Sequence, residues 1–389
     1  MKQQTITVAV FTILTGAAMT SPVRAGQTPG EFDIPSVNPL GSEQLEKLRH
    51  LAATDPEAKA LAEQARKNAA ELLDAKPHPL KVIHYEGLVN TDPRRIATVR
   101  KLREMGDVAR LVRYWQVSAD PNAAETLQRF ILAWTGTYRL TGNDVNENKF
   151  RPLLVAYHAL RPEFDPRDRR RVDPWVEELG KLHAEAVKKS RHFTNRYGKH
   201  VRLATLAGMI LGRDEWLAVA REGVKRFVRK SLHKDGTSED LQRRDTLTYH
   251  ASALRPPIEL AMLSGAKGRE LYTWESPRGG SLKKSVDYVV PYALGKKTRR
   301  EWKNTKVGLD RRRAEAGLDK YKPGKLYEPS QALELMEEAS YFDPGLLKVV
   351  RHLTGNKAKR FPTWQTLINE ACRPPEQSTT APARPTVGR

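Results

Sequence analysis

The chain has 389 residues, with 67 lysines and arginines against 46 aspartates and glutamates, which gives a formal net charge of +21 at pH 7. Hydrophobic residues make up 39% of the chain and recur along most of it, so the composition excludes wholesale disorder. A single cysteine, Cys372, excludes an intrachain disulfide and a cysteine-rich metal site. The excess of positive charge predicts an anionic partner, such as nucleic acid, anionic lipid or an acidic polysaccharide.

Residues 1–25 have the pattern of a secretory signal peptide. Lys2 precedes an apolar run over residues 8–19, and Val23-Arg24-Ala25 predicts cleavage after Ala25. The run is shorter than the roughly 20 apolar residues that a membrane span needs, and no other stretch reaches that length. A buried N-terminal helix is the alternative. We expect a periplasmic or secreted protein with no membrane span, which meets acidic polysaccharides rather than nucleic acid.

The rest of the chain divides into three parts. Residues 26–41 contain three prolines and predict a linker or N-terminal arm, and the Pro/Thr/Ala-rich residues 374–389 predict a disordered tail. Between them, residues 42–373 predict a single domain. Apolar residues recur there at helical spacing over residues 42–51, 55–73, 96–105, 107–118, 122–141, 149–160, 174–190, 199–211, 214–232, 238–263, 330–340 and 344–354.

Two segments depart from this helical pattern. Residues 279–294 are the least helical part of the core region, because they include the run Ser-Val-Asp-Tyr-Val-Val. Residues 299–325 carry many charges and predict an insertion that covers the surface. Ten or more helices without a repeat period argue against a solenoid and predict an all-α domain, either a bundle of antiparallel helical hairpins or a helical toroid.

Residues 138–152 form the first segment with polar side chains beyond what a helix needs. Gly142-Asn143-Asp144 predicts a helix end, and Asn146 is suited to cap the next helix. Asn146, Glu147 and Asn148 either face a ligand or belong to a helix–loop–helix connection with its capping residues.

Residues 191–211 form the second segment. Its first part gathers polar and basic side chains at the predicted start of a helix, where free backbone amides also favour an anion. These residues are either an anion site or a solvated basic face. They are Asn195, Arg196, Tyr197, Lys199, His200 and Arg202.

Residues 235–254 form the third segment, in which Arg243 and Arg244 precede Tyr249 and His250. On one continuous helix Arg243 would lie about 120° from Tyr249 and Arg244 about 140°, so Arg243 is the better placed of the two. A nearby guanidinium favours the phenolate of a tyrosine and makes it a usable base. The alternative is a tyrosine at a helix–helix contact beside exposed arginines.

The three segments together resemble the alginate lyase family of polysaccharide lyases, over roughly residues 80–265. The resemblance is carried by Thr-Gly-Asn-Asp-Val-Asn-Glu-Asn-Lys-Phe at 141–150, by residues 195–211, and by Asp-Gly-Thr-Ser at 235–238 with Arg-Arg-Asp-Thr-Leu-Thr-Tyr-His at 243–250. The family often has Asn-Asn-His at the start of the second segment, where this chain has Asn195-Arg196-Tyr197. Either Asn195 by position or His200 by chemistry therefore takes the role of the family's neutralising residue.

The resemblance implies a toroidal all-α fold and β-elimination on a polyuronate, with alginate as the first candidate. Tyr249 would act as base and acid, while Arg243 with Asn195 or His200 would neutralise the substrate carboxylate. The residues implied to contact neighbouring sugars are Tyr197, Lys199, Arg202, Arg244, His250, Asn146 and Asn148. No metal or other cofactor is required, and we expect a monomer.

A single acid–base residue suits mannuronate, because proton and leaving group lie on one face of that sugar. For guluronate, where they lie on opposite faces, His200 would be the separate base. Two alternatives stay open: a lyase for glucuronan or another glucuronate polymer, and a non-catalytic protein that binds acidic polysaccharide.

Overall fold

The computed structural model describes residues 37–373, and within this range the chain is helical, with only two isolated β-bridges outside the helices. The predicted signal peptide, most of the N-terminal arm and the predicted tail lie outside the described residues. None of the described helices is long and apolar enough to cross a membrane. The predicted all-α class is confirmed.

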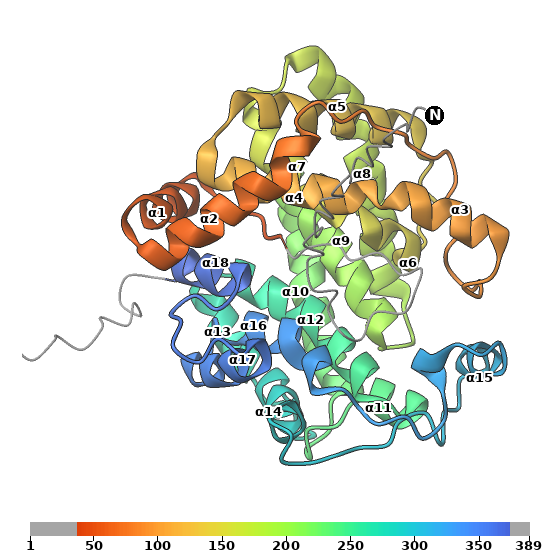
Figure 1. The fold of residues 1–389 in the computed structure, drawn as a ribbon. Helices are drawn as coiled ribbons and strands as arrows, with labels where there is room; N and C mark the ends of the chain where they lie inside the picture. Colours follow the sequence, from red (N-terminus) through yellow and green to blue (C-terminus); the bar gives the residue numbers. More distant parts are fainter. Residues whose placement is uncertain (1–36, 374–389) are drawn as a thin grey trace, which may run out of the picture.

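Figure 1 shows the helices, which follow one another along the chain. In chain order they are α1 (Ser42–Thr54), α2 (Pro56–Ala69), α3 (Pro93–Leu102), α4 (Glu104–Ser118), α5 (Pro121–Thr137), α6 (Asp144–Glu147), α7 (Arg151–Leu160), α8 (Pro166–Lys189), α9 (Asn195–Leu211), α10 (Asp214–Ser231), α11 (Glu239–Arg244), α12 (Leu247–Leu263), α13 (Ala266–Thr273), α14 (Leu282–Ala293), α15 (Gly308–Glu315), α16 (Leu333–Ala339), α17 (Leu347–Thr354) and α18 (Trp364–Cys372). Short 3₁₀ turns lie between several of them, including η4 (Asp319–Tyr321).

Four helices begin with the same local signal, an aspartate followed by proline. The side chains of Asp55, Asp92, Asp120 and Asp165 accept hydrogen bonds from backbone N–H groups of the first turns of α2, α3, α5 and α8. The aspartate satisfies donors that have no partner inside the helix, and proline at the first helical position loses no hydrogen bond. Local sequence therefore fixes where these helices start.

Helix α9 lies at the centre of the molecule and packs against α8, α10 and α12 (Figure 1). One apolar core lies among α1–α9 and α18 and a second among α10–α17, and α9 contributes side chains to both. Ala204 and Ala207 face the first core, and Val201 faces the second. The small residues of α9 allow its neighbours to approach closely, so one helix joins the two halves.

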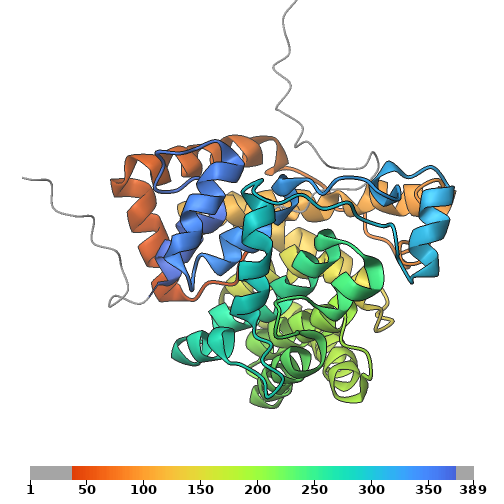
Figure 2. The ribbon, with the colours of Figure 1, turned by 90° about the horizontal axis from the view of Figure 1, so that it is seen from below.

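The two ends of the described chain meet. Helix α18 packs on α1, which Figures 1 and 2 show from two directions. The ammonium of Lys47 donates to the carbonyl of Arg373 over 2.8 Å, and the N–H of Phe361 donates to the carboxylate of Glu57 over 2.9 Å. Residues 37–40, the end of the expected arm, are buried against the core rather than free.

Two sequence-based expectations are wrong. Residues 279–294 are not the least helical part, because Ser281 caps helix α14 and the apolar residues Val286, Val289 and Ala293 recur on one buried face of it. Tertiary packing here overrides the strand preference of valine. The helix expected over residues 238–263 is two helices, α11 and α12, because Asp245 adopts a left-handed conformation with φ of 55°.

Candidate functional site

Tyr249 lies in the first turn of α12, directly after the break between the two helices. Thr246 caps α12 by accepting a hydrogen bond from the N–H of Thr248, and Asp245 turns the chain before it. Because of this break, the angles that a continuous helix would impose do not apply. The ring of Tyr249 is partly exposed.

The arginine that contacts Tyr249 is Arg244, not Arg243. The guanidinium carbon of Arg244 lies 3.6 Å from the centroid of the Tyr249 ring, and its Nη2 donates to buried Asp310 over 3.1 Å. The Arg243 side chain is 44% exposed, and its nearest carboxylate is that of Glu239, 3.8 Å away. The preference for Arg243 depended on an unbroken helix and is therefore wrong in geometry.

Three cations surround the phenol of Tyr249. Burial opposes ionisation of the phenol, but the charges of Arg244, Arg313 and Lys320 outweigh it, and the pKa of Tyr249 falls below its ordinary value of about 10 although Asp310 acts in the opposite direction. Trp302 closes one side, with its ring edge-on to that of Tyr249 at a centroid distance of 5.8 Å. This arrangement favours a phenolate that can accept a proton.

Helix α9 presents two side chains without protein partners. The amide of Asn195 and the ammonium of Lys199 make no hydrogen bond or ion pair within residues 37–373, and their spacing of four places them on one face of the helix. Burial lowers the pKa of Lys199, while Asp144 and Tyr249 act to raise it, which places the ammonium in the electrostatic range of the phenol. Both groups are therefore free to bind an anion.

Asp240 connects Asn195 to this site. Its Oδ2 accepts a hydrogen bond from the backbone N–H of Asn195, over 2.6 Å, and so satisfies a donor at the start of α9. Burial raises the pKa of Asp240 to about 7, despite this hydrogen bond and the charges of Arg244 and Lys199. The carboxyl holds the beginning of α9 against α11.

His200 belongs to a chain of hydrogen bonds whose other members, His183 and Glu147, are buried. Its Nδ1 lies 2.7 Å from Nδ1 of His183, whose Nε2 lies 2.7 Å from Oε2 of Glu147. Burial and the neighbouring His183 lower the pKa of His200 to about 4, so its imidazole is neutral near pH 7. Its Nε2 lies 3.8 Å from Asp144, which also accepts two hydrogen bonds from Arg196. This chain fastens the loop before α6 to α8 and α9.

Asn146, Asn148 and Arg202 have structural partners. The amide of Asn146 donates to the carbonyl of Ile83 over 3.2 Å, and Asn143, not Asn146, caps α6. Asn148 accepts a hydrogen bond from Arg202 over 2.9 Å. The expectation that Asn146 caps the following helix is therefore wrong.

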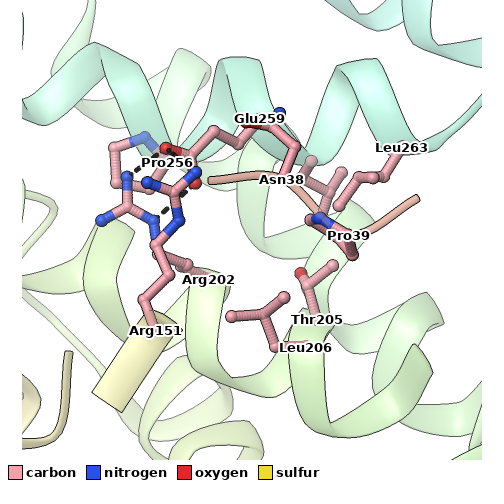
Figure 3. Close-up of a pocket in the computed structure, with 10 residues that line it drawn as sticks. Asn38, Pro39, Arg151, Arg202, Thr205, Leu206, Pro256, Glu259 and Leu263 are labelled. Carbon is pink, nitrogen blue, oxygen red and sulfur yellow. Dashed lines mark hydrogen bonds and ion pairs between the residues drawn. The ribbon is translucent and has the colours of Figure 1, made fainter. Parts of the chain in front are cut away.

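Arg202 is part of a buried ion cluster beside a small pocket (Figure 3). The Nε and Nη2 atoms of Arg202 each donate to the carboxylate of Glu259 over 2.6 Å, and the Nη2 of Arg151 lies 3.3 Å from the same carboxylate. Pro39 and Asn38 cover the pocket with apolar residues from α9 and α12. The cluster joins α7, α9 and α12 through the shared carboxylate of Glu259.

Tyr197 and His250 lie in the interior. Tyr197 is 1% exposed and packs edge-on against Phe193, so it has no surface on which a sugar could stack. His250 is fully buried, with its Nδ1 2.7 Å from the hydroxyl of Ser238 and its Nε2 3.1 Å from the carbonyl of Ser285. The geometry gives neither residue a contact with a ligand.

The residues missed by sequence analysis come from the charged segment 299–325. It supplies Trp302, Asp310, Arg313 and Lys320 to the surroundings of Tyr249, so it is part of the candidate site rather than a surface cover. The density of basic residues in this segment was the available signal. Within residues 37–373 no group of three or more histidine, cysteine or acidic side chains is arranged to hold a metal ion.

Comparison with known proteins agrees with the resemblance. A family model described as alginate lyase matches residues 49–299, which is more than half of the chain. The chain therefore belongs to the alginate lyase family. A polysaccharide lyase from Stenotrophomonas maltophilia is 23% identical over 188 residues, which cover 45% of this chain and 57% of that relative.

Solved structures show the same fold. An alginate lyase from Bacteroides ovatus superposes with a TM-score of 0.60 at 15% identity, covering 86% of this chain and 99% of that one. Alginate lyase A1-III from Sphingomonas species A1 superposes with a TM-score of 0.52 at 16% identity, covering 74% and 92%. A variant of A1-III complexed with a tetrasaccharide has a TM-score of 0.51 at 17% identity, covering 65% and 76%. The expected α/α toroid is confirmed.

Proposed function

We propose that the protein is a polyuronate lyase that cleaves alginate by β-elimination. The observation that carries this proposal is the phenol of Tyr249, which lies among three cations that lower its pKa and within the electrostatic range of Lys199. Family membership supports the reaction class, and the tetrasaccharide complex of a relative supports an oligosaccharide as the bound species.

Tyr249 acts as the base. Its phenolate removes the proton from carbon 5 of the uronate, the bond between carbon 4 and the glycosidic oxygen breaks, and a double bond forms between carbons 4 and 5. The phenol then returns the proton to the departing oxygen. The positive charges of Arg244, Arg313 and Lys320 stabilise the phenolate of Tyr249, so it forms at a pH below the ordinary pKa of tyrosine.

Asn195 and Lys199 neutralise the substrate carboxylate. Loss of the carbon 5 proton places a second negative charge on that group, and donors without protein partners can bind it with no internal hydrogen bond to break. Removing one donor of this type costs about 3 kcal/mol of transition-state stabilisation. We assign this part to Asn195 and Lys199 rather than to His200, because the Nε2 of His200 already lies 3.8 Å from the carboxylate of Asp144.

A single acid–base residue favours mannuronate over guluronate, its epimer at carbon 5. A separate base on the opposite face of the sugar is the role expected for His200, and the Nδ1 of that imidazole is hydrogen-bonded to His183 in the chain to Glu147. Tyr249 is then the single group for both proton transfers, which requires proton and leaving group on one face. We propose mannuronate-rich alginate as the substrate.

Export to the periplasm or the medium is part of the proposal, because residues 1–25 have the pattern of a cleaved signal peptide. An exported basic protein is suited to a polyanion outside the cytoplasm, and we propose that it acts there as a monomer.

The test is product formation. The protein without residues 1–25 is mixed with alginate, and the ultraviolet absorbance of the new double bond is followed together with polymer binding. A rise in absorbance with shortened chains supports the lyase. Binding without any unsaturated product contradicts it and favours a non-catalytic protein, which the replacement of the family's Asn-Asn-His pattern by Asn195-Arg196-Tyr197 would then explain.

A further inference from the structure

The site contains an element that begins where the family match ends, at residue 299. Residues 299–327, here called the basic loop, leave the helical body and close on themselves. The N–H of Glu301 donates to the carbonyl of Lys325 over 2.8 Å, and the N–H of Tyr327 donates to the carbonyl of Arg299 over 2.9 Å. Figures 1 and 2 show α15, which this loop carries, at the edge of the molecule.

The basic loop is fastened to the chain immediately before Tyr249. The carboxylate of Asp245 accepts hydrogen bonds from the Arg299 guanidinium over 2.5 Å and from the Asn304 N–H over 3.0 Å. The carbonyl of Asp245 accepts from the N–H of Trp302 over 2.9 Å. Asp245 is the left-handed residue that separates α11 from α12, so the loop is held at the turn that orients Tyr249.

Arg313 is the guanidinium that the basic loop directs at Tyr249. Its Nη1 donates to the hydroxyl of Tyr321 over 2.9 Å, and Tyr321 packs on Trp302 at a centroid distance of 5.0 Å. Interactions with Tyr321 and Tyr249 raise the pKa of Arg313 against the opposing effect of burial. No carboxylate lies within ion-pair distance of Arg313 in the part of the chain that the structure describes.

The charges that face Tyr249 differ in how they are compensated. Arg244 of α11 forms an ion pair with Asp310 of α15, whereas Arg313 has no such partner. Lys320 of η4 and Lys199 of α9 are the other charged groups that act on the phenol. Arg313 is therefore the guanidinium whose charge is least cancelled by the protein itself.

We propose that Arg313 is a positioning residue that holds Tyr249 in its anionic form, so that the basic loop, beyond the family-matched region, completes the active site. The role of Arg313 in activity rests on the proposed lyase function, but the charge state of Tyr249 is measurable without substrate. Arg313 acts through the phenol and has no part in the bonds that form or break.

The experiment compares Arg313→Gln with Arg312→Gln, a neighbour on α15 whose side chain is exposed. Phenolate absorbance is titrated with pH in each protein and in the same protein carrying Tyr249→Phe, so that the difference isolates Tyr249. The pH dependence of kcat is measured in parallel on polymannuronate. Arg313→Gln should move both midpoints upward by about one pH unit, with roughly tenfold lower activity below them and full activity above them. Arg312→Gln should move neither.

Arg313→Lys is the second variant, and it guards against failure of Arg313→Gln to fold. It keeps the charge without the planar fork, so the midpoints should move in the same direction by less. Unmoved midpoints in the Arg313 variants, or a fall in kcat that is equal at every pH, would overturn the inference. If wild-type protein gives no product from any polyuronate, the proposed function fails, and the absorbance titration still decides whether Arg313 sets the charge of Tyr249.

Discussion

The guanidinium of Arg244 lies across the ring of Tyr249, 3.6 Å from its centroid, although a continuous helix would place the two residues about 140° apart. The contact exists because Asp245 interrupts the helix between them. A cation held against the phenol from the preceding helix, with Arg313 from a distant segment, gives Tyr249 the charge environment of a base.

Replacing Tyr249 by phenylalanine should abolish turnover and leave polymer binding nearly unchanged, because the ring stays and only the hydroxyl is lost. The matched control is Tyr197→Phe. The Tyr197 hydroxyl is buried and has no hydrogen-bond partner in the structure, so its removal should leave activity intact. Initial rates of unsaturated product and binding isotherms check both variants. Full activity in Tyr249→Phe would show that the base is another group.

The two neighbouring arginines should differ strongly in effect. Arg244→Gln removes the cation from the face of Tyr249 and should lower kcat about 100-fold, the loss expected for an electrostatic contact at a reacting group. Arg243→Gln should change kcat by less than about threefold, because its partly exposed side chain makes only a long ion pair with Glu239. Arg244 also forms an ion pair with buried Asp310, so the thermal stability of each variant should be measured together with its kinetics. Equal losses in the two variants would contradict the assignment.

We expect Lys199 to contribute to activity and to lower the stability of the folded protein. Lys199→Met removes an ammonium that has no ion-pair partner and whose pKa burial lowers, so the variant should unfold at a higher temperature. Its kcat should fall about 100-fold, because the substrate carboxylate loses a donor. Thermal unfolding and product formation are measured on the same preparation. A variant with unchanged activity would exclude Lys199 from carboxylate binding.

Stability should fall in acid through His250. Burial lowers the pKa of its imidazole in the folded state to about 4, from an ordinary value of about 6.5, so between these values the unfolded chain binds more protons. The contribution of this group is complete above pH 6.5 and is lost as pH falls toward 4, by about 1.4 kcal/mol per pH unit.

In His250→Gln the glutamine side chain does not titrate. The free energy of unfolding should therefore depend less steeply on pH in this window, even if the variant is less stable at pH 7. His352→Gln, which changes an exposed side chain on α17, is the control. Denaturant titrations from pH 4 to 7.5 would check this. The same slope in wild type and His250→Gln would show that His250 contributes nothing to acid unfolding.

Local signals in the sequence predicted much of the fold. The helical periodicity of apolar residues gave the all-α class, because amphipathicity depends on neighbours along the chain. The Asp–Pro pairs at Asp55, Asp92, Asp120 and Asp165 are a further local signal that sequence analysis did not use. Helix α14 was missed, since its valines favour strands and only packing against distant helices decides otherwise.

The candidate site was predicted only in part, because local sequence patterns do not reveal contacts between distant segments. Tyr249, Asn195 and Lys199 lie in segments whose composition is unusual by itself. The preference for Arg243 over Arg244 was wrong because one backbone dihedral at Asp245 breaks the helical register. Arg313 reaches Tyr249 from 64 positions further along the chain, and no local pattern connects residues at that separation.

The most direct measurement is a comparison of polymannuronate, polyguluronate and polyglucuronate as substrates for the purified protein, with the absorbance of the carbon 4–carbon 5 double bond as the readout. The account predicts a rise on polymannuronate, since Tyr249 alone handles both proton transfers and His200 is hydrogen-bonded to His183. A rise on polyguluronate alone would contradict the single-residue mechanism and require a second base, and a rise on polyglucuronate alone would contradict alginate as the substrate. Bound polymer with no unsaturated product from any of the three would contradict the lyase itself.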